Sequence, residues 1–130
     1  MIFLDSSAIV KLVEARDQLK ALWLHRAVAG HLVADPHAVL TRAATNLDRL
    51  RAVHPTGMTA RWLEQWRVVL AGGAESALDA LTSRSAHTVE LRQNSPFAGV
   101  LSESERHAVL TAFATYWRDA HAAPTANKLI

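Results

Sequence analysis

The carboxylate Asp5 and the hydroxyls Ser6 and Ser7 follow a short apolar stretch in the opening segment "MIFLDSSAIVKLVEA". A carboxylate at the carboxyl end of a parallel strand points into the crevice where α/β folds bind ligands. Divalent cations such as Mg²⁺ take oxygen ligands, so Asp5 is a candidate metal ligand. The alternative is a plain cap residue, because Ser6 and Ser7 also fit the start of a helix beginning at Ala8.

The composition predicts a folded domain. Half of the 130 residues are hydrophobic, and the length fits one domain with a real core. The absence of cysteine excludes disulfides and thiolate metal sites. No apolar run reaches about eighteen residues, and the first positive charge, Lys11, follows the apolar start. We therefore expect a cytoplasmic protein with neither a membrane span nor a signal peptide.

The net charge of +2 is too small to indicate nucleic acid by itself. Eleven of the fourteen cations are arginine, and Arg42, Arg49 and Arg51 lie in one segment. Arginine suits bidentate phosphate contacts. The alternative is that an Ala- and Arg-rich chain reflects only the base composition of its genome.

The first third of the chain predicts a parallel βαβ unit. Residues 2–4 form a short apolar run, and residues 31–34 are a histidine followed by three apolar residues; both are typical of short strands, with helical spacing between them that ends at Gly30. Pro36 fits the first turn of the next helix, expected over 36–53. A strand, a helical crossover and a second strand form a parallel pair.

The second half of the chain predicts mostly helices. The stretch "HPTG" breaks the chain at residues 54–57. Helical spacing and capping signals, including the capping box of Ser102 and Glu105, then predict helices over 59–71, 75–81, 86–93 and 103–121. We expect the halves 1–53 and 58–121 to form one compact unit, with 122–130 as a frayed tail.

The opening segment, with "HLVAD" at residues 31–35, resembles PIN domains, especially the VapC-type toxins of toxin–antitoxin pairs. The resemblance covers residues 1 to about 52. It implies a metal-dependent ribonuclease in which clustered carboxylates hold Mg²⁺ or Mn²⁺, and the metal activates water and neutralises charge on the scissile phosphate.

The PIN resemblance assigns roles to individual acids. Asp5 matches the first family acid, whereas Thr41 stands where the second, a glutamate, is expected. Asp79, in "LDAL", is the candidate for the third acid, and no counterpart of the fourth is found. Asp35 or Asp48 is the candidate to compensate for the missing glutamate. An active site would thus use Asp5 and Asp79 as catalytic metal ligands, with Asp35 as a further ligand.

The same resemblance implies supporting roles for other polar residues. Ser6 and Ser7 would steady the metal site without binding the ion. Arg42, Arg49 and Arg51 would contact the phosphates of the RNA.

Residues 61–113, with "LTSRS" and "ELRQNSPFAGVLS", resemble the C-terminal region of helix-turn-helix regulators of the antitoxin type. This resemblance implies an interaction or dimerisation module that contacts a cognate toxin. Phe97, within this stretch, is either a core anchor or an exposed partner contact. A natural fusion, a decayed toxin and an engineered chain all stay open as origins.

These observations predict a helix-rich α/β domain with a PIN-like first half. The expected function is a toxin–antitoxin component of PIN type, a metal-dependent ribonuclease with an incomplete acidic site. The alternative is a non-catalytic antitoxin-like, oligomerisation or interaction protein. The expected partners are a cognate toxin or antitoxin, RNA if the site is active, and a second copy of the chain.

Overall fold

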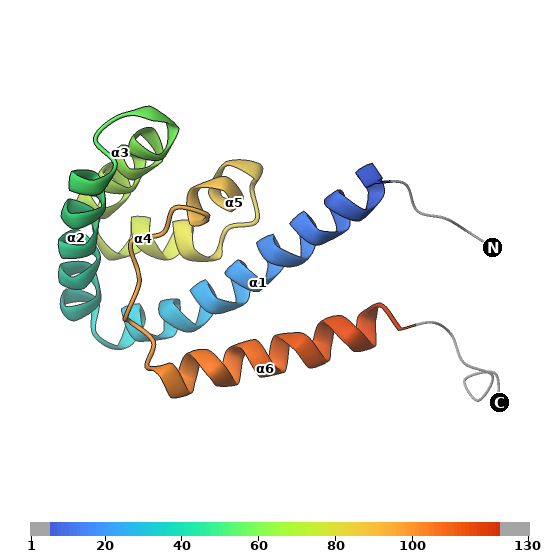
Figure 1. The fold of residues 1–130 in the computed structure, drawn as a ribbon. Helices are drawn as coiled ribbons and strands as arrows, with labels where there is room; N and C mark the ends of the chain where they lie inside the picture. Colours follow the sequence, from blue (N-terminus) through green and yellow to red (C-terminus); the bar gives the residue numbers. More distant parts are fainter. Residues whose placement is uncertain (1–5, 123–130) are drawn as a thin grey trace.

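A computed structural model describes residues 6–122, and every regular element in this range is an α-helix (Figure 1). The helices are α1 (Ser6–Ala34), α2 (Pro36–Val53), α3 (Gly57–Ala71), α4 (Gly73–Thr82), α5 (Ala86–Arg92) and α6 (Glu103–Ala120). None of these helices is both long enough and apolar enough to cross a bilayer.

The predicted α/β fold and the PIN domain are wrong for this chain, because a PIN domain requires a parallel sheet and residues 6–122 contain no strand. The expected strand over 31–34 is the last turn of α1. The expected strand over 2–4 lies outside the described residues, as does most of the predicted tail 122–130.

Helix α1 is continuous because its buried positions keep helical spacing through the place where a strand was expected. Val28, Ala29 and Leu32 are buried on one face of the helix. Gly30 is exposed between them and does not end the helix. A glycine inside a helix costs about 1 kcal/mol relative to alanine, which is less than the gain from burying a leucine side chain, about 1.5–3 kcal/mol.

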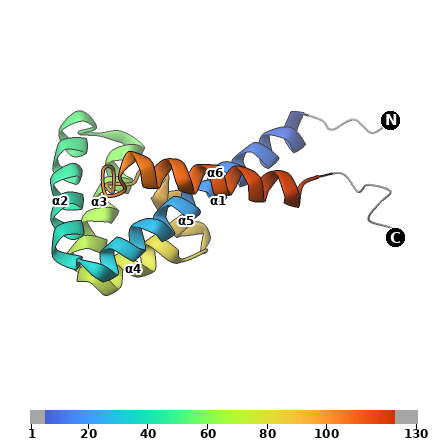
Figure 2. The same ribbon diagram turned by 90° about the horizontal axis from the view of Figure 1, so that it is seen from below.

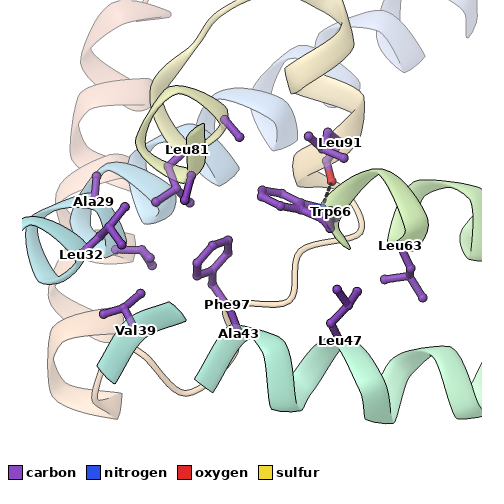
Figure 3. Close-up of a cluster of buried hydrophobic side chains, with 13 residues drawn as sticks. Ala29, Leu32, Val39, Ala43, Leu47, Leu63, Trp66, Leu81, Leu91 and Phe97 are labelled. Carbon is purple, nitrogen blue, oxygen red and sulfur yellow. Dashed lines mark hydrogen bonds between the residues drawn. The ribbon is translucent and has the colours of Figure 1, made fainter. Parts of the chain in front are cut away.

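Helices α1 to α5 enclose one hydrophobic core (Figure 3). Trp66 of α3 has no exposed surface, and its ring meets that of Phe97 edge-on at 5.3 Å. The core draws on both sides of the break at residues 54–57, and its other members are Val28, Ala29, Leu32, Val39, Ala43, Leu47, Leu63, Ala77, Ala80, Leu81 and Leu91.

The local signals that end and begin helices act as the sequence predicts at several places. Asp35 caps α2 by accepting the Ala38 N–H at 3.2 Å, and Pro36 is the first helical residue. The capping box of Ser102 and Glu105 opens α6. Gly73, with φ of +84°, allows the sharp turn between α3 and α4.

Helix α6 is the outlying element of the fold. Among the described helices it packs on α1 alone. The N-terminal turns of α1 and the C-terminal turns of α6 project together on the side away from α2 and α3 (Figures 1 and 2).

Candidate functional site

The acids expected to hold a metal are dispersed in the described structure. Asp79 lies on the exposed face of α4, and Asp35 is the exposed cap of α2. Asp48 pairs with Arg67 of α3 at 3.4 Å. Asp5 lies outside the described residues. Within residues 6–122, no three histidines or acids come close enough to hold a metal ion together.

The two serines expected to steady the metal site are the first residues of α1. Ser6 and Ser7 are both exposed. They lie at the projecting end of α1, on a helix that neither Asp35 nor Asp79 belongs to.

Two of the three predicted RNA contacts lie together and the third lies apart. Arg42 and Arg49 line one shallow hollow along α2, with a volume of about 530 Å³. Arg51 points to α3 instead, where its Nε donates to Glu64 at 2.7 Å. This bond is the main cause that lowers the pKa of the Glu64 carboxyl. Arg51 also donates to the carbonyls of His54 and Pro55, both at 3.0 Å, and so closes the loop after α2.

Phe97 is part of the core rather than of the surface. Its side chain is 5% exposed and points between α2 and Trp66 (Figure 3). The segment that carries it is held by Asn46 of α2, whose amide donates to the carbonyls of Pro96 and Ala98 at 2.8 Å each.

A buried histidine and a half-buried serine that sequence reasoning did not single out form a hydrogen-bonded pair. The ring of His25 on α1 donates from Nδ1 to the Ala21 carbonyl at 2.6 Å, and Nε2 accepts the Ser95 hydroxyl at 2.8 Å. Burial lowers the pKa of His25, and the charge of Arg92 lowers it further. Ser95 Oγ accepts the Phe97 N–H at 3.2 Å, so the pair fastens the segment before α6 to α1.

The most unusual surface of the molecule is the projecting N-terminal end of α1, which we call the α1 arm (residues 6–16). Four large aliphatic side chains of the arm are exposed by 43–53%: Ile9, Val10, Leu12 and Val13. The only half-buried residue of the arm is Ala8. A contiguous exposed apolar patch on a protein surface often marks an interaction site.

The arm continues the stripe of α1 on which α6 packs. Trp23 meets Phe113 at 5.4 Å, and His31 Nε2 lies 2.5 Å from Glu105 Oε2. Val13 precedes His31 by about five turns, and Leu12 precedes Trp23 by about three turns, at 3.6 residues per turn. Both arm residues therefore lie on or beside this stripe.

Helix α6 ends before it can cover the arm. The pairs Trp23–Phe113 and His31–Glu105 define an antiparallel register along α1. Continued along both helices, this register places Ala120, the last residue of α6, beside residue 16 of α1. Ile9, Leu12 and Val13 lie beyond that point and stay exposed.

The sequence contains the signal for this surface. Ile9, Leu12 and Val13 have the spacing of one helical face, and Val10 widens the apolar arc beyond that face.

Comparisons with known proteins find no family model, no curated protein and no solved structure that matches this chain. The resemblance of residues 61–113 to antitoxin-type regulators therefore has no support, and the PIN resemblance is overturned by the fold.

Proposed function

We propose that the protein is a non-catalytic interaction protein that pairs with a second copy of itself through the α1 arm. The exposed aliphatic cluster of Ile9, Val10, Leu12 and Val13 carries this proposal. The ribonuclease hypothesis rested on the PIN resemblance and loses its basis with it.

Charge balance on the arm favours a second copy as the occupant. Lys11, Glu14, Arg16 and Asp17 surround the aliphatic cluster with two positive and two negative charges. Arg16 and Lys20 already lie 3.5 and 3.6 Å from Asp17. Two such arms do not repel each other, and like copies pair most often across a two-fold axis.

The position of the arm also favours pairing between copies. The arm projects away from α2 and α3 (Figures 1 and 2), so two arms can meet without contact between the two bodies. A two-fold interface covers both clusters at once, that is, eight aliphatic side chains.

The expected affinity is modest. Full burial of an aliphatic side chain contributes about 1.5–3 kcal/mol, and these side chains are already about half covered, so eight of them contribute roughly 6–12 kcal/mol. Association itself costs about 4–15 kcal/mol. We therefore expect a dimer with a Kd in the micromolar to millimolar range.

Sedimentation velocity tests the proposal over about 10 µM to 1 mM protein, which spans the expected Kd. The wild-type chain is expected to shift from monomer to dimer as its concentration rises. Ile9→Gln combined with Val13→Gln is expected to stay monomeric, with an unchanged helical circular dichroism spectrum, because glutamine is a good helix former.

Val68→Gln is the matched control. Val68 is 74% exposed on α3, far from the arm in the chain. This variant is expected to dimerise as the wild type does. A wild-type chain that stays monomeric throughout, or a Val68→Gln variant that loses pairing equally, contradicts the proposal.

A further inference from the structure

Arg92 is a buried cation that is held by backbone carbonyls. Arg92 lies on α5 and is 3% exposed. Nη1 donates to the Ala80 carbonyl at 3.0 Å and to the Ser83 carbonyl at 2.7 Å. Both carbonyls lie at the C-terminal end of α4, where the helix dipole offsets part of a positive charge.

The rest of the guanidinium charge has no counter-ion among the described residues. No ion pair described for residues 6–122 includes Arg92. Burial lowers the pKa of Arg92, and the next cause is a second cation, Arg26. A fully buried arginine is normally paired with an acid. An anion is the kind of partner that would balance the remaining charge.

The hydrogen bonds of the described residues leave the Nη2 end of the guanidinium for an anion. Both of the hydrogen bonds described for the group use Nη1. Nε is buried and has no hydrogen-bond partner in the described structure. Nη2 can therefore donate to one carboxylate oxygen, and such a charge-assisted hydrogen bond is stronger than a bond between neutral groups.

Arg92 lines a pocket of about 290 Å³ between α1, α5 and α6. Arg84 and Gln18 add a second guanidinium and an amide to its lining. The remaining wall is apolar and consists of Ala15, Leu19, Leu22, Val89 and Trp117.

We propose that this pocket binds a small organic carboxylate, with the carboxylate on Arg92 and Arg84 and an apolar body against Leu19, Leu22 and Trp117. The volume is at the lower end for ligand pockets, about 300–1,000 Å³, so the ligand is a small acid. The apolar wall favours a carboxylate with a hydrocarbon body over an inorganic anion or a nucleic-acid backbone.

The same chemistry can come from a free acid or from the carboxyl end of a peptide. Benzoate represents the free acid, and N-acetyl-leucine represents a peptide end. Benzamide and N-acetyl-leucine amide are their uncharged counterparts. The pocket shares Ala15 with the α1 arm but none of its four exposed aliphatic side chains, and carboxylate binding has a different readout from dimerisation.

NMR titration of the full chain with these four compounds tests the proposal. We expect a saturable shift of the Trp117 indole N–H with at least one carboxylate and none with the matching amide. Arg84→Gln is expected to weaken binding by about tenfold or more, since a hydrogen bond to a charged group is worth at least that factor. Tighter binding of N-acetyl-leucine would identify a peptide end as the source, and tighter binding of benzoate a free acid.

The variants keep the test decisive. Arg84 is exposed, so Arg84→Gln is expected to fold as the wild type does. Arg61→Gln, an exposed arginine on α3, is the matched control and is expected to bind as the wild type does. The proposal is overturned if neither carboxylate shifts Trp117 at about 20 mM, a concentration above the millimolar range of weak binding. Equal binding of the amides, or unchanged binding by Arg84→Gln, overturns it as well.

Discussion

The indole N–H of Trp66 donates to the backbone carbonyl of Leu91 at 2.8 Å, and this bond joins α3 to α5 across the core (Figure 3). Both side chains are buried, with exposed fractions of 0% and 2%. Because the pair is distant in sequence, the bond forms only when α3, α4 and α5 have assembled.

Trp66→Phe is expected to lower the free energy of unfolding by about 1–2 kcal/mol, from the lost hydrogen bond and the smaller ring. The cost stays moderate because the Leu91 carbonyl also accepts the Asn94 N–H at 3.1 Å. Urea unfolding followed by circular dichroism measures the difference.

Trp62→Phe is the control for this change, since Trp62 is half-buried and makes no indole hydrogen bond in the described structure. It is expected to cost less than Trp66→Phe. Equal losses in the two variants would show that the Trp66–Leu91 bond does not contribute.

The buried His25 makes stability depend on pH. Burial lowers the pKa of His25 below its usual 6.5. The unfolded chain therefore binds a proton before the folded chain does, so stability is full above pH 6.5 and falls as the pH drops toward the folded pKa.

Urea unfolding of the wild type between pH 7.5 and pH 5, on either side of the usual histidine pKa, is expected to show this loss. His25→Gln should flatten the dependence, although it lowers stability at pH 7. His107→Gln, which removes an exposed histidine of α6, should leave it unchanged. A His25→Gln variant with the wild-type slope would exclude His25 as the source.

The sequence predicts those parts of the fold that depend on local signals. The expected helix over 36–53 coincides with α2. Its start is set locally, because Pro36 is the first helical residue and Asp35 accepts the N–H of Ala38, only three residues further on. The capping box of Ser102 and Glu105 likewise fixes the start of α6. Such signals need no tertiary partner, so a single sequence is enough to predict them.

The error at residues 31–34 has a physical cause. A run of three apolar residues after a histidine does not distinguish a buried strand from a buried helical turn. The decisive fact is that Leu32 packs with Val28 and Ala29 on one face, and this depends on α4 lying against α1. Gly30 also suggested a helix end at a position where α1 in fact continues.

The candidate sites depend on contacts that no local pattern contains. His25 and Ser95 are 70 residues apart, and Arg92 meets carbonyls 9 and 12 residues away through the turn between α4 and α5. The exposure of the α1 arm depends on where α6 ends along α1. These relationships are visible only once the helices are placed.

Helix α6 is expected to open independently of the rest of the molecule. It packs on α1 alone, and Phe113 is its one buried residue in the described structure. Phe113→Ala should cost α6 about 3–5 kcal/mol of local stability, the usual loss for a buried phenylalanine. Native-state hydrogen exchange should then show fast exchange in α6 with slow exchange retained in α4.

Tyr116→Ala is the control for α6. Tyr116 also contacts Trp23, with ring centroids 5.1 Å apart, but it is 46% exposed. A smaller effect on α6 exchange is expected. Equal acceleration of exchange in α4 and α6 by Phe113→Ala would mean that the chain unfolds as one unit.

Variants of Asp35 distinguish its role as a helix cap from a role as a metal ligand. Its carboxylate accepts the Ala38 N–H at 3.2 Å at the start of α2. Asp35→Ala is therefore expected to lower the free energy of unfolding by about 0.5–2 kcal/mol, whereas Asp35→Asn should change it little, because asparagine caps as well as aspartate.

A metal ligand behaves differently, since an amide cannot replace the charge that Mg²⁺ binds. Thermal unfolding of both variants with and without about 10 mM Mg²⁺ separates the two roles, because a bound ion stabilises the folded state by mass action. An Mg²⁺-dependent rise in Tm that Asp35→Asn abolishes would identify a ligand, and the same Tm change in wild type and Asp35→Asn would identify a cap.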